Sequence, residues 1–503
     1  MDRRRYLKVV AATAAVSVLA GCSEIDRERP ETVTSTPEPE PGPGPGPGPG
    51  PEPTSEPDRV VRYGIEFDRV LDAVDDLGMD ASGEKPIDDA LSKALRDGTL
   101  VEFPAGRYFL RDPISIKYIE NWGIRGLGDQ PTDVRFVSVP GKGQQLVTTD
   151  DGDGILVENV AFDYSEAREG SLGLLLKAQD NLRVQDVHFV GFNPNEEEGG
   201  IVNLSPQALS PRGTAIVDGL VRIGPTDIRP HRHFPGPANE PGIIWLGEKH
   251  RGTLVVRNSR LENAGENGIY ASRTSGKVQI EDSLFTNNNQ AALRIGGEGS
   301  HVKNCRFVVD TDNANPDNEN GFINPHCILW ETGENGLSGG SIEGCSFVYK
   351  SVPKTPIVAI WADGSAGAFT VKNTRFTIDA PGVQAIRVDD PRNPRLGKTA
   401  AKPWDVTLTD IFIEGKGAGM LPMIQIDGRP NSTLSNCCLS VSNVDRLVQV
   451  TNSSGSSLEN INISGPGKWL TTQQSDLVVQ NVSRERVCRP VDPSTVNLPG
   501  HAL

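Results

Sequence analysis

The sequence of 503 residues has few lysines, few aromatic residues and little positive charge. Lysine occurs 16 times against 34 arginines, aromatic residues make up 6%, and the formal net charge is -16. This acidic balance excludes a protein that coats nucleic acid, because such proteins neutralise phosphates with Lys and Arg. The 54 Gly and 38 Pro exclude a helical bundle, because both residues destabilise helix interiors. An acidic, lysine-poor composition favours a highly saline medium, where salt screens the repulsion between carboxylates.

The N-terminus has the pattern of an export signal. Residues 2–8 read DRRRYLK and precede an apolar run, residues 9–20, that is too short to cross a bilayer. DRRRYLK resembles a twin-arginine signal, and LAGC at residues 19–22 resembles the lipobox of exported lipoproteins. The two resemblances imply export in the folded state, cleavage before Cys22 and a lipid on the Cys22 sulfur. Residues 1–22 are therefore predicted to be a signal, and the protein is predicted to be anchored to the outer face of the cell membrane.

Residues 23–58 are predicted to be a stalk. They include TPEPEPGPGPGPGPGPEPTSEP, which lacks the apolar side chains needed for a core. Such a segment favours polyproline II, which rises about 3.1 Å per residue. The stalk would hold the following domain away from the membrane.

A six-residue pattern recurs through the rest of the chain. It consists of an aliphatic residue, any residue, Asn or Asp, any two residues, and an aromatic or aliphatic residue, as in VENVAF and VKNTRF. The copies start at Val157, Val184, Val256, Ile280, Val302, Ile342, Val371, Leu408, Leu434, Leu458 and Val479. The commonest spacings of 21 to 29 residues are typical of a solenoid and leave no room for helical crossovers. The pattern predicts a parallel β-helix in which the first residue of each copy stacks inward.

A second strand precedes most copies by about ten residues. Period-2 alternation predicts that its aliphatic residues point inward, namely Ile244, Ile269, Leu293, Ile360, Ile386, Ile424 and Val448. The residues that follow them are then predicted to point outward, namely Trp245, Tyr270, Arg294, Trp361, Arg387, Gln425 and Gln449. In HCILWETG the same alternation predicts that Trp330 points outward and that Glu331 is buried. The alternative is a local shift of register that exposes Glu331.

The segment before the repeats carries a family resemblance. Residues 80–110, DASGEKPIDDALSKALRDGTLVEFPAGRYFL, are predicted to form a short helix after Pro86, then a strand, a turn and a strand. The helix would cover the open first coil. The segment resembles the start of the pectate-lyase-like and pectinase-like β-helix superfamily, which implies a right-handed single-stranded fold and frequent action on polysaccharides.

The fold class is thus predicted as all-β: a right-handed single-stranded parallel β-helix (solenoid) with a short N-terminal capping helix. It is expected over residues 59–490, followed by a C-terminal tail, 491–503. Residues 193–250 break the period and are interpreted as a long excursion with one or two degenerate coils.

Two sets of residues in the sequence are of types that can ligate metals: the cysteines and an acidic loop. Cys305, Cys345 and Cys437 occupy the same position in three copies of the repeat and are interpreted as core fillers. The acidic loop with Asp310, Asp312, Asp317 and Glu319 offers the oxygens that calcium prefers, but it lacks the EF-hand spacing. No metal site is assigned, and the cofactor is left unknown with calcium open.

The outward residues predict a glycan-binding groove. Sugars stack on aromatic rings and hydrogen-bond to amides, carboxylates and guanidinium groups. The predicted substrate-binding residues are Trp245, Tyr270, Trp330, Trp361, Gln425 and Gln449. The predicted catalytic residues are Asp363, Asp389, Asp427, Arg387 and Arg294.

Two classes of function remain open. Asp363, Asp389 and Asp427 fall on neighbouring coils, where paired carboxyls could serve a hydrolase, and Arg387 or Arg294 could remove a proton in a lyase. The NTD, DD, GHG and RIK signatures that pectinase-like hydrolases carry on successive coils do not stand here as an intact set, and the RxPxxR signature of pectate lyases is absent. The prediction is a surface-anchored protein that binds an acidic polysaccharide and cleaves or modifies it. The alternative is a non-catalytic glycan-binding or structural protein.

Overall fold

The computed structural model describes residues 59–484, apart from residues 139–143, 164, 166–171, 193–201, 227–241, 315–323, 354–355, 396 and 418. The predicted signal with Cys22, the stalk and the C-terminal tail lie outside the described residues. Among the described residues, no helix has the length and apolarity required to cross a membrane.

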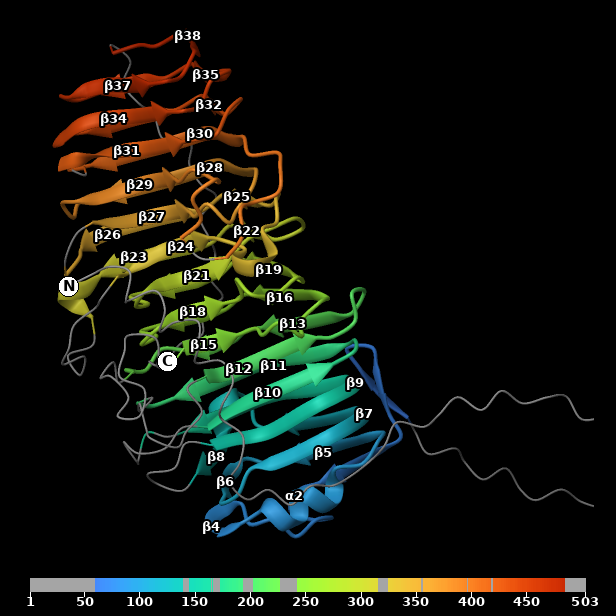
Figure 1. Cartoon of the computed structure of the whole chain (residues 1–503). Coiled ribbons are helices and arrows are strands. Elements are labelled where there is room, and N and C mark those ends of the chain that lie inside the picture. Colours follow the sequence, from blue (N-terminus) through green and yellow to red (C-terminus); the bar gives the residue numbers. More distant parts are fainter. Residues whose placement is uncertain are drawn as a thin grey trace, which may run out of the picture.

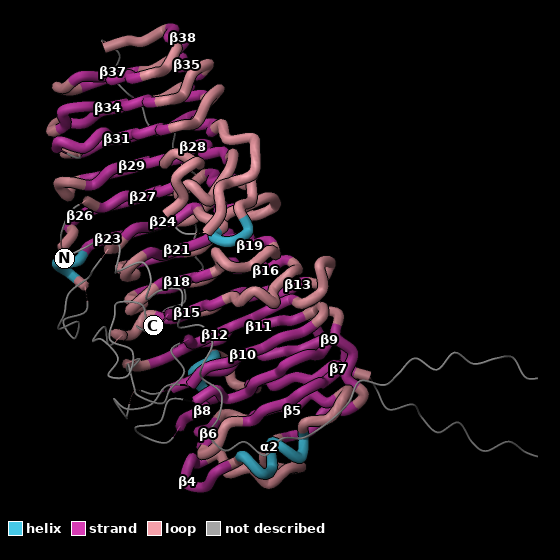
Figure 2. Tube along the Cα trace, viewed as in Figure 1, coloured by secondary structure: helices cyan, strands magenta, loops and turns pink. Residues whose placement is uncertain are grey.

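The fold is a right-handed parallel β-helix, as predicted (Figure 1). Each coil contributes strands to three parallel sheets, here called faces A, B and C, and the coils stack along the long axis of the molecule (Figure 2). Parallel stacking satisfies the backbone donors and acceptors of every inner coil through its two neighbours.

Face A contains the first parts of β7 (Ile114–Gly126) and β9 (Gln144–Asp163). It continues through β10 (Leu172–Ala178), β12 (Val202–Ala208), β15 (Gly242–Trp245), β18 (Asn267–Tyr270), β21 (Ala291–Ile295), β24 (His326–Trp330), β27 (Ile357–Ala362), β29 (Val383–Val388), β31 (Gly419–Asp427), β34 (Val444–Thr451) and β37 (Lys468–Gln473).

Face B contains β3 (Arg69–Asp72), β5 (Thr99–Phe103), later parts of β7 and β9, and the first part of β11 (Leu182–Val190). It continues through β13 (Thr214–Asp218), β16 (Thr253–Arg257), β19 (Lys277–Glu281), β22 (His301–Lys303), β25 (Ser341–Glu343), β28 (Phe369–Ile378), β30 (Val406–Gly415), β32 (Thr433–Ser435), β35 (Ser456–Glu459) and β38 (Leu477–Gln480).

Face C contains β4 (Ser82–Pro86), β6 (Gly106–Leu110), β8 (Val134–Ser138) and the last parts of β9, β11, β28 and β30. Its remaining strands are β14 (Val221–Arg222), β17 (Arg260–Glu262), β20 (Leu284–Thr286), β23 (Arg306–Asp310), β26 (Ser346–Ser351), β33 (Cys438–Val441) and β36 (Asn462–Ser464).

The repeat forms the inner stacks. The predicted inward residues of face B pair in register from coil to coil, as in Val256 with Ile280 and Ile280 with Val302. They are buried, except that Val479 of β38 pairs with Leu458 but is 41% exposed. The last position of the pattern forms a column of phenylalanines on face C, where the rings of Phe307 and Phe347 stack 4.8 Å apart. The predicted inward residues of face A are buried in the same way.

The Asn or Asp of the pattern makes the bend between faces B and C. Ten of these residues have left-handed backbone, with φ between 47° and 56°, and Gly344 takes the position in one coil. Asn and Asp tolerate this conformation better than other residues with side chains. Some of their side chains also bond along the stack, as Asn460 Nδ2 does to Asn436 Oδ1 at 3.0 Å. The left-handed backbone at the bend therefore explains why Asn or Asp recurs there.

One coil of the β-helix lacks the six-residue pattern. Residues 202–222 form β12, β13 and β14, and Val217 continues the face B stack between Val184 and Val256. Here Gly219 occupies the bend, and Arg222 replaces the phenylalanine of the column. The buried Arg222 guanidinium donates from Nη2 to the Pro225 carbonyl and to Thr226 Oγ1, each at 2.9 Å. The interpretation of this region as a degenerate coil is therefore correct for residues 202–222.

The predicted capping helix is α2 (Asp88–Ala94), which lies at the N-terminal end of the solenoid (Figure 1). Its Leu91 joins the core, and Asp88 Oδ1 accepts hydrogen bonds from the backbone of Arg111 and Asp112. A hairpin of β1 (Val60–Arg62) and β2 (Ile65–Phe67) precedes the first coil. Short 3-10 turns occur at η1 (Pro131–Asp133), η2 (Thr311–Asn313) and η3 (Gly333–Asn335).

The three repeat cysteines are core residues. Cys305, Cys345 and Cys437 are free thiols, and all three are buried in the core. Their interpretation as core fillers is confirmed. Cys438, the neighbour of Cys437, is disulfide-bonded.

Candidate functional site

The outward residues of face A form one row in register. Trp245 pairs with Tyr270 and Tyr270 with Arg294, and higher in the solenoid Trp361 pairs with Arg387. Gln425 and Gln449 continue the row on the next two coils. The predicted outward orientation is correct for these residues, and we call this row the face A stripe.

Trp330 does not belong to the stripe, so its prediction as an outward substrate-binding residue is wrong. It is fully buried, pairs with Ile295 and Ala362, and stacks on Phe369 with the ring centroids 5.7 Å apart. Ile328 aligns with Leu293, so Leu329 takes the outward place and Trp330 points inward. The predicted alternation is therefore one residue out of register in this strand.

A row of carboxylates runs beside the stripe on the outward side. Glu331, Asp363 and Asp389 each continue the parallel ladder directly after β24, β27 and β29, and Asp427 follows at the end of β31. Four acidic groups at strand spacing of about 4.8 Å repel one another unless each is neutralised. The contacts of each carboxylate therefore decide whether it is available for chemistry.

Glu331 is held by two arginines. Arg294 Nε donates to Glu331 Oε1 at 2.7 Å, and Arg395 Nη2 lies 3.0 Å from Oε2. Burial acts to raise the pKa of Glu331, but the two guanidinium groups outweigh it and the pKa is lowered. Burial acts to lower the pKa of Arg294, but Glu331 reverses this and the pKa is raised. Arg294 is thus held protonated, which suits binding and not the removal of a proton.

The Asp389 carboxylate accepts hydrogen bonds from one residue of its own coil and one of the coil below. Its Oδ1 accepts from Arg387 Nε and its Oδ2 from Trp361 Nε1, both at 2.7 Å. The guanidinium groups of Arg387 and Arg395 lie 4.8 and 5.1 Å from the Trp361 ring centroid. Trp361 is therefore a support for two arginines as well as a partly exposed ring.

The other two predicted acids have structural partners. Asp363 is buried and accepts from the backbone of Ser365 at 2.8 Å and of Arg395 at 2.7 Å. Asp427 accepts from Thr451 Oγ1 at 2.7 Å and from Asn452 Nδ2 at 3.0 Å. These contacts occupy the carboxyls that had been predicted as an acid and base pair.

The segment that connects β29 to β30 contains several Arg and Lys residues, and it folds back over the lower coils. Backbone bonds join Lys398 to Gly333 at 3.1 Å and Ala401 to Gly336 at 2.7 Å. Arg395 of this segment reaches Glu331, 64 residues earlier in the chain. The segment thus supplies a charged side chain to the middle of face A.

Buried Arg429 supports these loops from beneath. Its guanidinium donates to the carbonyls of Asp389 and Ala366 at 2.8 Å and of Gly367 at 2.9 Å. Burial lowers the pKa of Arg429 to about 10, against the opposing effect of Asp389, Asp363, Asp390 and Asp427. The group therefore stays protonated at neutral pH. These partners lie 40 to 63 residues away in the chain, so no local sequence pattern marks Arg429.

Glu266 is a second residue that the sequence analysis missed. It lies between β17 and β18 and is partly exposed. Burial raises the pKa of Glu266 to about 7, although Arg294 and Arg273 act to lower it. A carboxyl that changes charge near neutral pH is a common feature of functional sites.

The contacts of His326 hold it within the structure. Its Nδ1 accepts the backbone N–H of Val358 at 3.0 Å, and its ring lies edge-on to Trp361 with centroids 5.3 Å apart. Burial lowers the pKa of His326 to about 4, so it is neutral at physiological pH.

The acidic loop gives no metal centre within the described residues. Asp310 accepts from Lys350 Nζ at 3.0 Å and from Asn313 Nδ2 at 3.0 Å. The backbone N–H of Asp312 donates to Ser351 Oγ at 2.9 Å. Asp317 and Glu319 lie outside the described residues. In the described part of the chain, no group of three His, Cys, Asp or Glu side chains is arranged to hold a metal ion.

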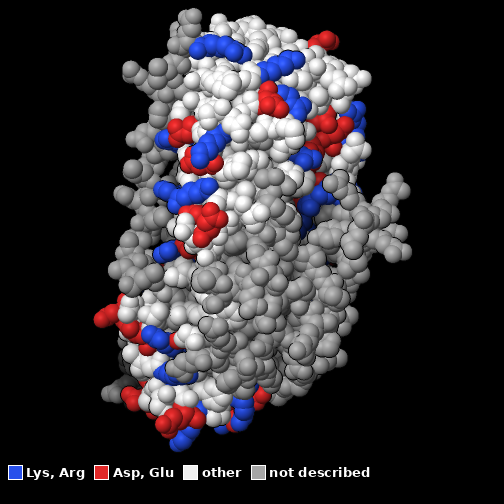
Figure 3. All heavy atoms as spheres, turned by 90° about the vertical axis from the view of Figure 1, so that its left-hand side faces the viewer, with Lys and Arg blue, Asp and Glu red and all other residues white. Residues whose placement is uncertain are grey.

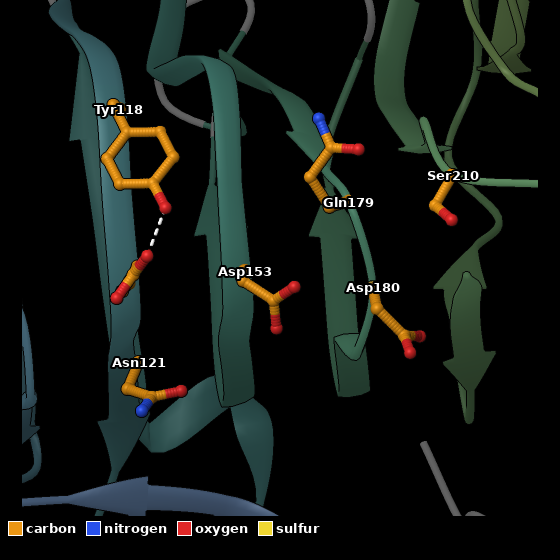
Figure 4. A pocket seen from close by; sticks show the side chains of 7 residues that line it. Tyr118, Asn121, Asp153, Gln179, Asp180 and Ser210 are labelled. Carbon is orange, nitrogen blue, oxygen red and sulfur yellow. Dashed lines mark hydrogen bonds between the residues drawn. The ribbon is translucent and has the colours of Figure 1, made fainter. Parts of the chain in front are cut away.

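A polar hollow of about 440 Å³ lies at the corner between faces A and B (Figure 4). It is lined by Tyr118, Glu120, Asn121, Asp153, Gln179, Asp180 and Ser210. Burial raises the pKa of Asp153, and the negative charges of Asp180 and Glu120 add to the effect. Asp180 already accepts from the backbone and hydroxyl of Thr214, and Tyr118 donates to Glu120. Because Tyr118, Glu120 and Asp180 already have hydrogen-bond partners, the hollow is a weaker candidate than the face A stripe.

Surface charge is mixed. On the side drawn in Figure 3, basic and acidic side chains of the described residues alternate without a large area of one sign. Local groups of arginines, and not an overall positive field, would therefore have to attract an acidic ligand.

The chain is similar in structure to several solved proteins, at low sequence identity. No family model and no curated protein sequence matches the chain. The A-module of mannuronan C-5 epimerase AlgE6 from Azotobacter vinelandii is 11% identical, with 83% of this chain and 100% of that chain covered and a TM-score of 0.40. The catalytic unit of a GH87 alpha-1,3-glucanase from Streptomyces thermodiastaticus is 13% identical, with 82% and 69% covered and a TM-score of 0.40. The surface protein and adhesin PfbA of Streptococcus pneumoniae is 14% identical, with 82% and 99% covered and a TM-score of 0.36.

Proposed function

We propose that the protein binds an acidic polysaccharide along face A. The observation that carries the proposal is the stripe itself, which presents rings, guanidinium groups and amides in register from coil to coil, interrupted by Leu329 between Arg294 and Trp361. Rings stack on the CH faces of sugars, and guanidinium groups form paired hydrogen bonds with carboxylates. A row at strand spacing suits an extended chain better than a small ligand.

The same contacts favour binding over hydrolysis. Hydrolysis of a glycosidic bond needs two carboxyls that are free to act as acid and as base or nucleophile. Asp363 and Asp427 are occupied by the hydrogen bonds described above, and Asp389 is paired with Arg387. Arg294 and Arg387 each bond a carboxylate, so both fit a binding role better than that of a lyase base.

Retention on polysaccharide gels tests the proposal. In high salt with calcium, we expect retention on a uronate polymer, and we expect Trp245→Ala to weaken it about fivefold, since a stacked ring contributes roughly 1 kcal/mol. Trp245 is chosen because its ring is partly exposed and has no ring partner among the described residues. Affinity electrophoresis at several polymer concentrations gives the dissociation constants.

Tyr118→Ala is the control, because Tyr118 lines the polar hollow and not the stripe. Weakened retention in Tyr118→Ala with unchanged retention in Trp245→Ala would place binding in the hollow. The same incubations are assayed for unsaturated products by ultraviolet absorbance and for new reducing ends. Either product, if lost in Arg387→Ala or Asp389→Asn, would show that face A is catalytic and overturn the binding-only proposal.

We also propose that the protein is exported by the twin-arginine route and lipid-anchored through Cys22. The disulfide at Cys438 supports export, because disulfides persist in oxidising compartments and are rare in the cytosol. Cys22→Ser would remove the sulfur that carries the lipid, so we expect the variant to be released into the medium. Fractionation followed by immunoblotting measures this, with Cys437→Ser, a buried core position, as the control. A Cys22→Ser protein that stays in the membrane fraction would contradict the proposal.

A further inference from the structure

The C-terminal end of the solenoid is open in the part of the chain that the structure describes. There, β37 pairs only with β34 and β38 only with β35, so each strand has one edge without a neighbour (Figure 1). Val479 continues the inner stack of face B above Leu458, yet 41% of it is exposed. The opposite end is covered by α2, whose Leu91 is buried. Unpaired edges and exposed core residues promote aggregation, so the last coil needs a cover.

A bonded cysteine lies close to this end. Cys438 of β33 is disulfide-bonded, whereas its neighbour Cys437 is a free, buried thiol. Leu439 pairs with Ile463, and both are buried, so alternation directs Cys438 to the outside of face C. Its sulfur is therefore on the side of the stack that another segment of chain can reach.

Two cysteines of the chain can be the partner of Cys438. The sequence has seven cysteines, and four of them are free thiols, namely Cys305, Cys327, Cys345 and Cys437. Cys22 and Cys488 remain. Cys22 precedes the hairpin of β1 and β2, which bonds to β9, many coils below β33 in the stack. In the proposed function the Cys22 sulfur also carries the lipid, which leaves Cys488.

The described end of the chain lies within reach of Cys438. Asn462 pairs with Cys438 from the coil above, and Ser483 bridges to Asn462 from the next coil. Ser483 is therefore about 10 Å from Cys438, which is two strand spacings. Cys488 follows Ser483 by five residues, which span up to roughly 17 Å when extended. A disulfide needs Cα atoms about 4.4–6.8 Å apart, so a chain that turns back along the outside of face C can bring Cys488 to Cys438.

The remaining tail has a composition that suits a cover. Residues 485–503 contain five Val or Leu side chains, which can pack on the exposed apolar residues of the last coil. They also contain three prolines. Because proline has no N–H to donate, such a segment can lie against a strand edge without presenting a new edge for pairing.

We propose that Cys488 is the disulfide partner of Cys438, and that this bond holds residues 485–503 over the last coils as the cover of the C-terminal end. The inference rests on the proposed export, because the bond persists in an oxidising compartment. As the S–S bond forms, the two thiols lose two protons and two electrons, and the disulfide of a thiol oxidoreductase is reduced to a dithiol. The bond encloses residues 439–487, which include β34 to β38. These coils then cannot peel from the stack while the bond is intact.

Mass spectrometry of the exported, full-length protein without reduction tests the pairing. Trypsin should leave Cys437 and Cys438 in the peptide 417–446 and Cys488 in the peptide 487–503, because it does not cleave before Pro430 or Pro490. We expect the two peptides to be joined in wild type and in Cys437→Ser, and to be separate in Cys438→Ser. A free Cys438 thiol or a bond from Cys438 to a second chain would overturn the inference. A bond from Cys438 to Cys22 would overturn it as well and would also contradict the lipid anchor.

Hydrogen exchange tests the cover. A cross-link that closes a long loop restricts local opening, so we expect the amides of β34 to β38 to exchange at least about tenfold faster in Cys488→Ser than in wild type. Amides of β16 and β19, in the middle of the solenoid, should keep their rates. Cys438→Ser should match Cys488→Ser, and the double variant should show no further change, because all three lack the same bond. Arg489→Ser is the matched control, since it alters the adjacent position of the tail and leaves the sulfur in place.

The outcomes separate this inference from the proposed function. Unchanged exchange of β34 to β38 in Cys488→Ser would show that the tail is not the cover. A reduced Cys438 in protein that is exported and retained on a uronate gel would overturn this inference and leave the proposed function intact. A wild-type protein that stays in the cytosol with Cys438 reduced would overturn both this inference and the proposed export.

Discussion

Replacing Ile280 by aspartate is expected to abolish folding of the solenoid. Ile280 is fully buried and lies in the face B stack between Val256 and Val302. A carboxylate at this position would have no charged partner, and an unpaired buried charge costs about 3–5 kcal/mol or more. That loss is comparable to the whole stability of many domains. Soluble yield and urea unfolding followed by circular dichroism measure the effect.

Gln279→Asp is the matched control for this prediction. Gln279 precedes Ile280 on the same strand, and its side chain points outward and is partly exposed. We expect Gln279→Asp to change the free energy of unfolding by less than about 1 kcal/mol. A soluble, cooperatively melting Ile280→Asp protein would show that Ile280 does not face the core.

Replacing Arg429 by methionine is expected to destabilise the loops that carry the candidate site. The change removes the donors for the buried carbonyls of Asp389, Ala366 and Gly367. A buried acceptor left without a partner costs about 1–3 kcal/mol, so we expect a loss of at least about 3 kcal/mol. The loss should also displace Asp389 and with it the Trp361 contact. Urea unfolding and retention on a uronate gel measure the two consequences.

Arg446→Met is the control, since Arg446 is a partly exposed arginine on face A whose bonds to Gln449 and Met420 lie near the surface. We expect it to lower the free energy of unfolding by less than about 1 kcal/mol. Arg429→Lys separates charge from geometry, because lysine keeps the charge but has three donors on one atom. If Arg429→Lys is as stable as wild type, the fork of the guanidinium is not required.

The candidate site could be predicted only in part. The stripe residues Trp245, Tyr270 and Arg387 were identified because alternation along a strand places neighbours on opposite sides of a sheet. Alternation alone does not show which of two neighbouring residues points inward; the pairing with the adjacent strand decides this. Ile328 aligns with the inward Leu293, so Trp330 also points inward, contrary to the prediction. Glu266 lies just before β18, so no alternating run of residues includes it.

The sequence by itself determined the architecture. An aliphatic residue at the start of each copy, an Asn or Asp at the bend and an apolar residue at the end are local features, and they recur in most of the coils that stack on one another. Only the tertiary structure decided which charged groups are available. Glu331 meets Arg294 and Arg395 from positions 37 and 64 residues away, and Arg429 gathers carbonyls 40 to 63 residues away. Such contacts depend on where loops of different lengths return to the stack, and the repeat does not encode that.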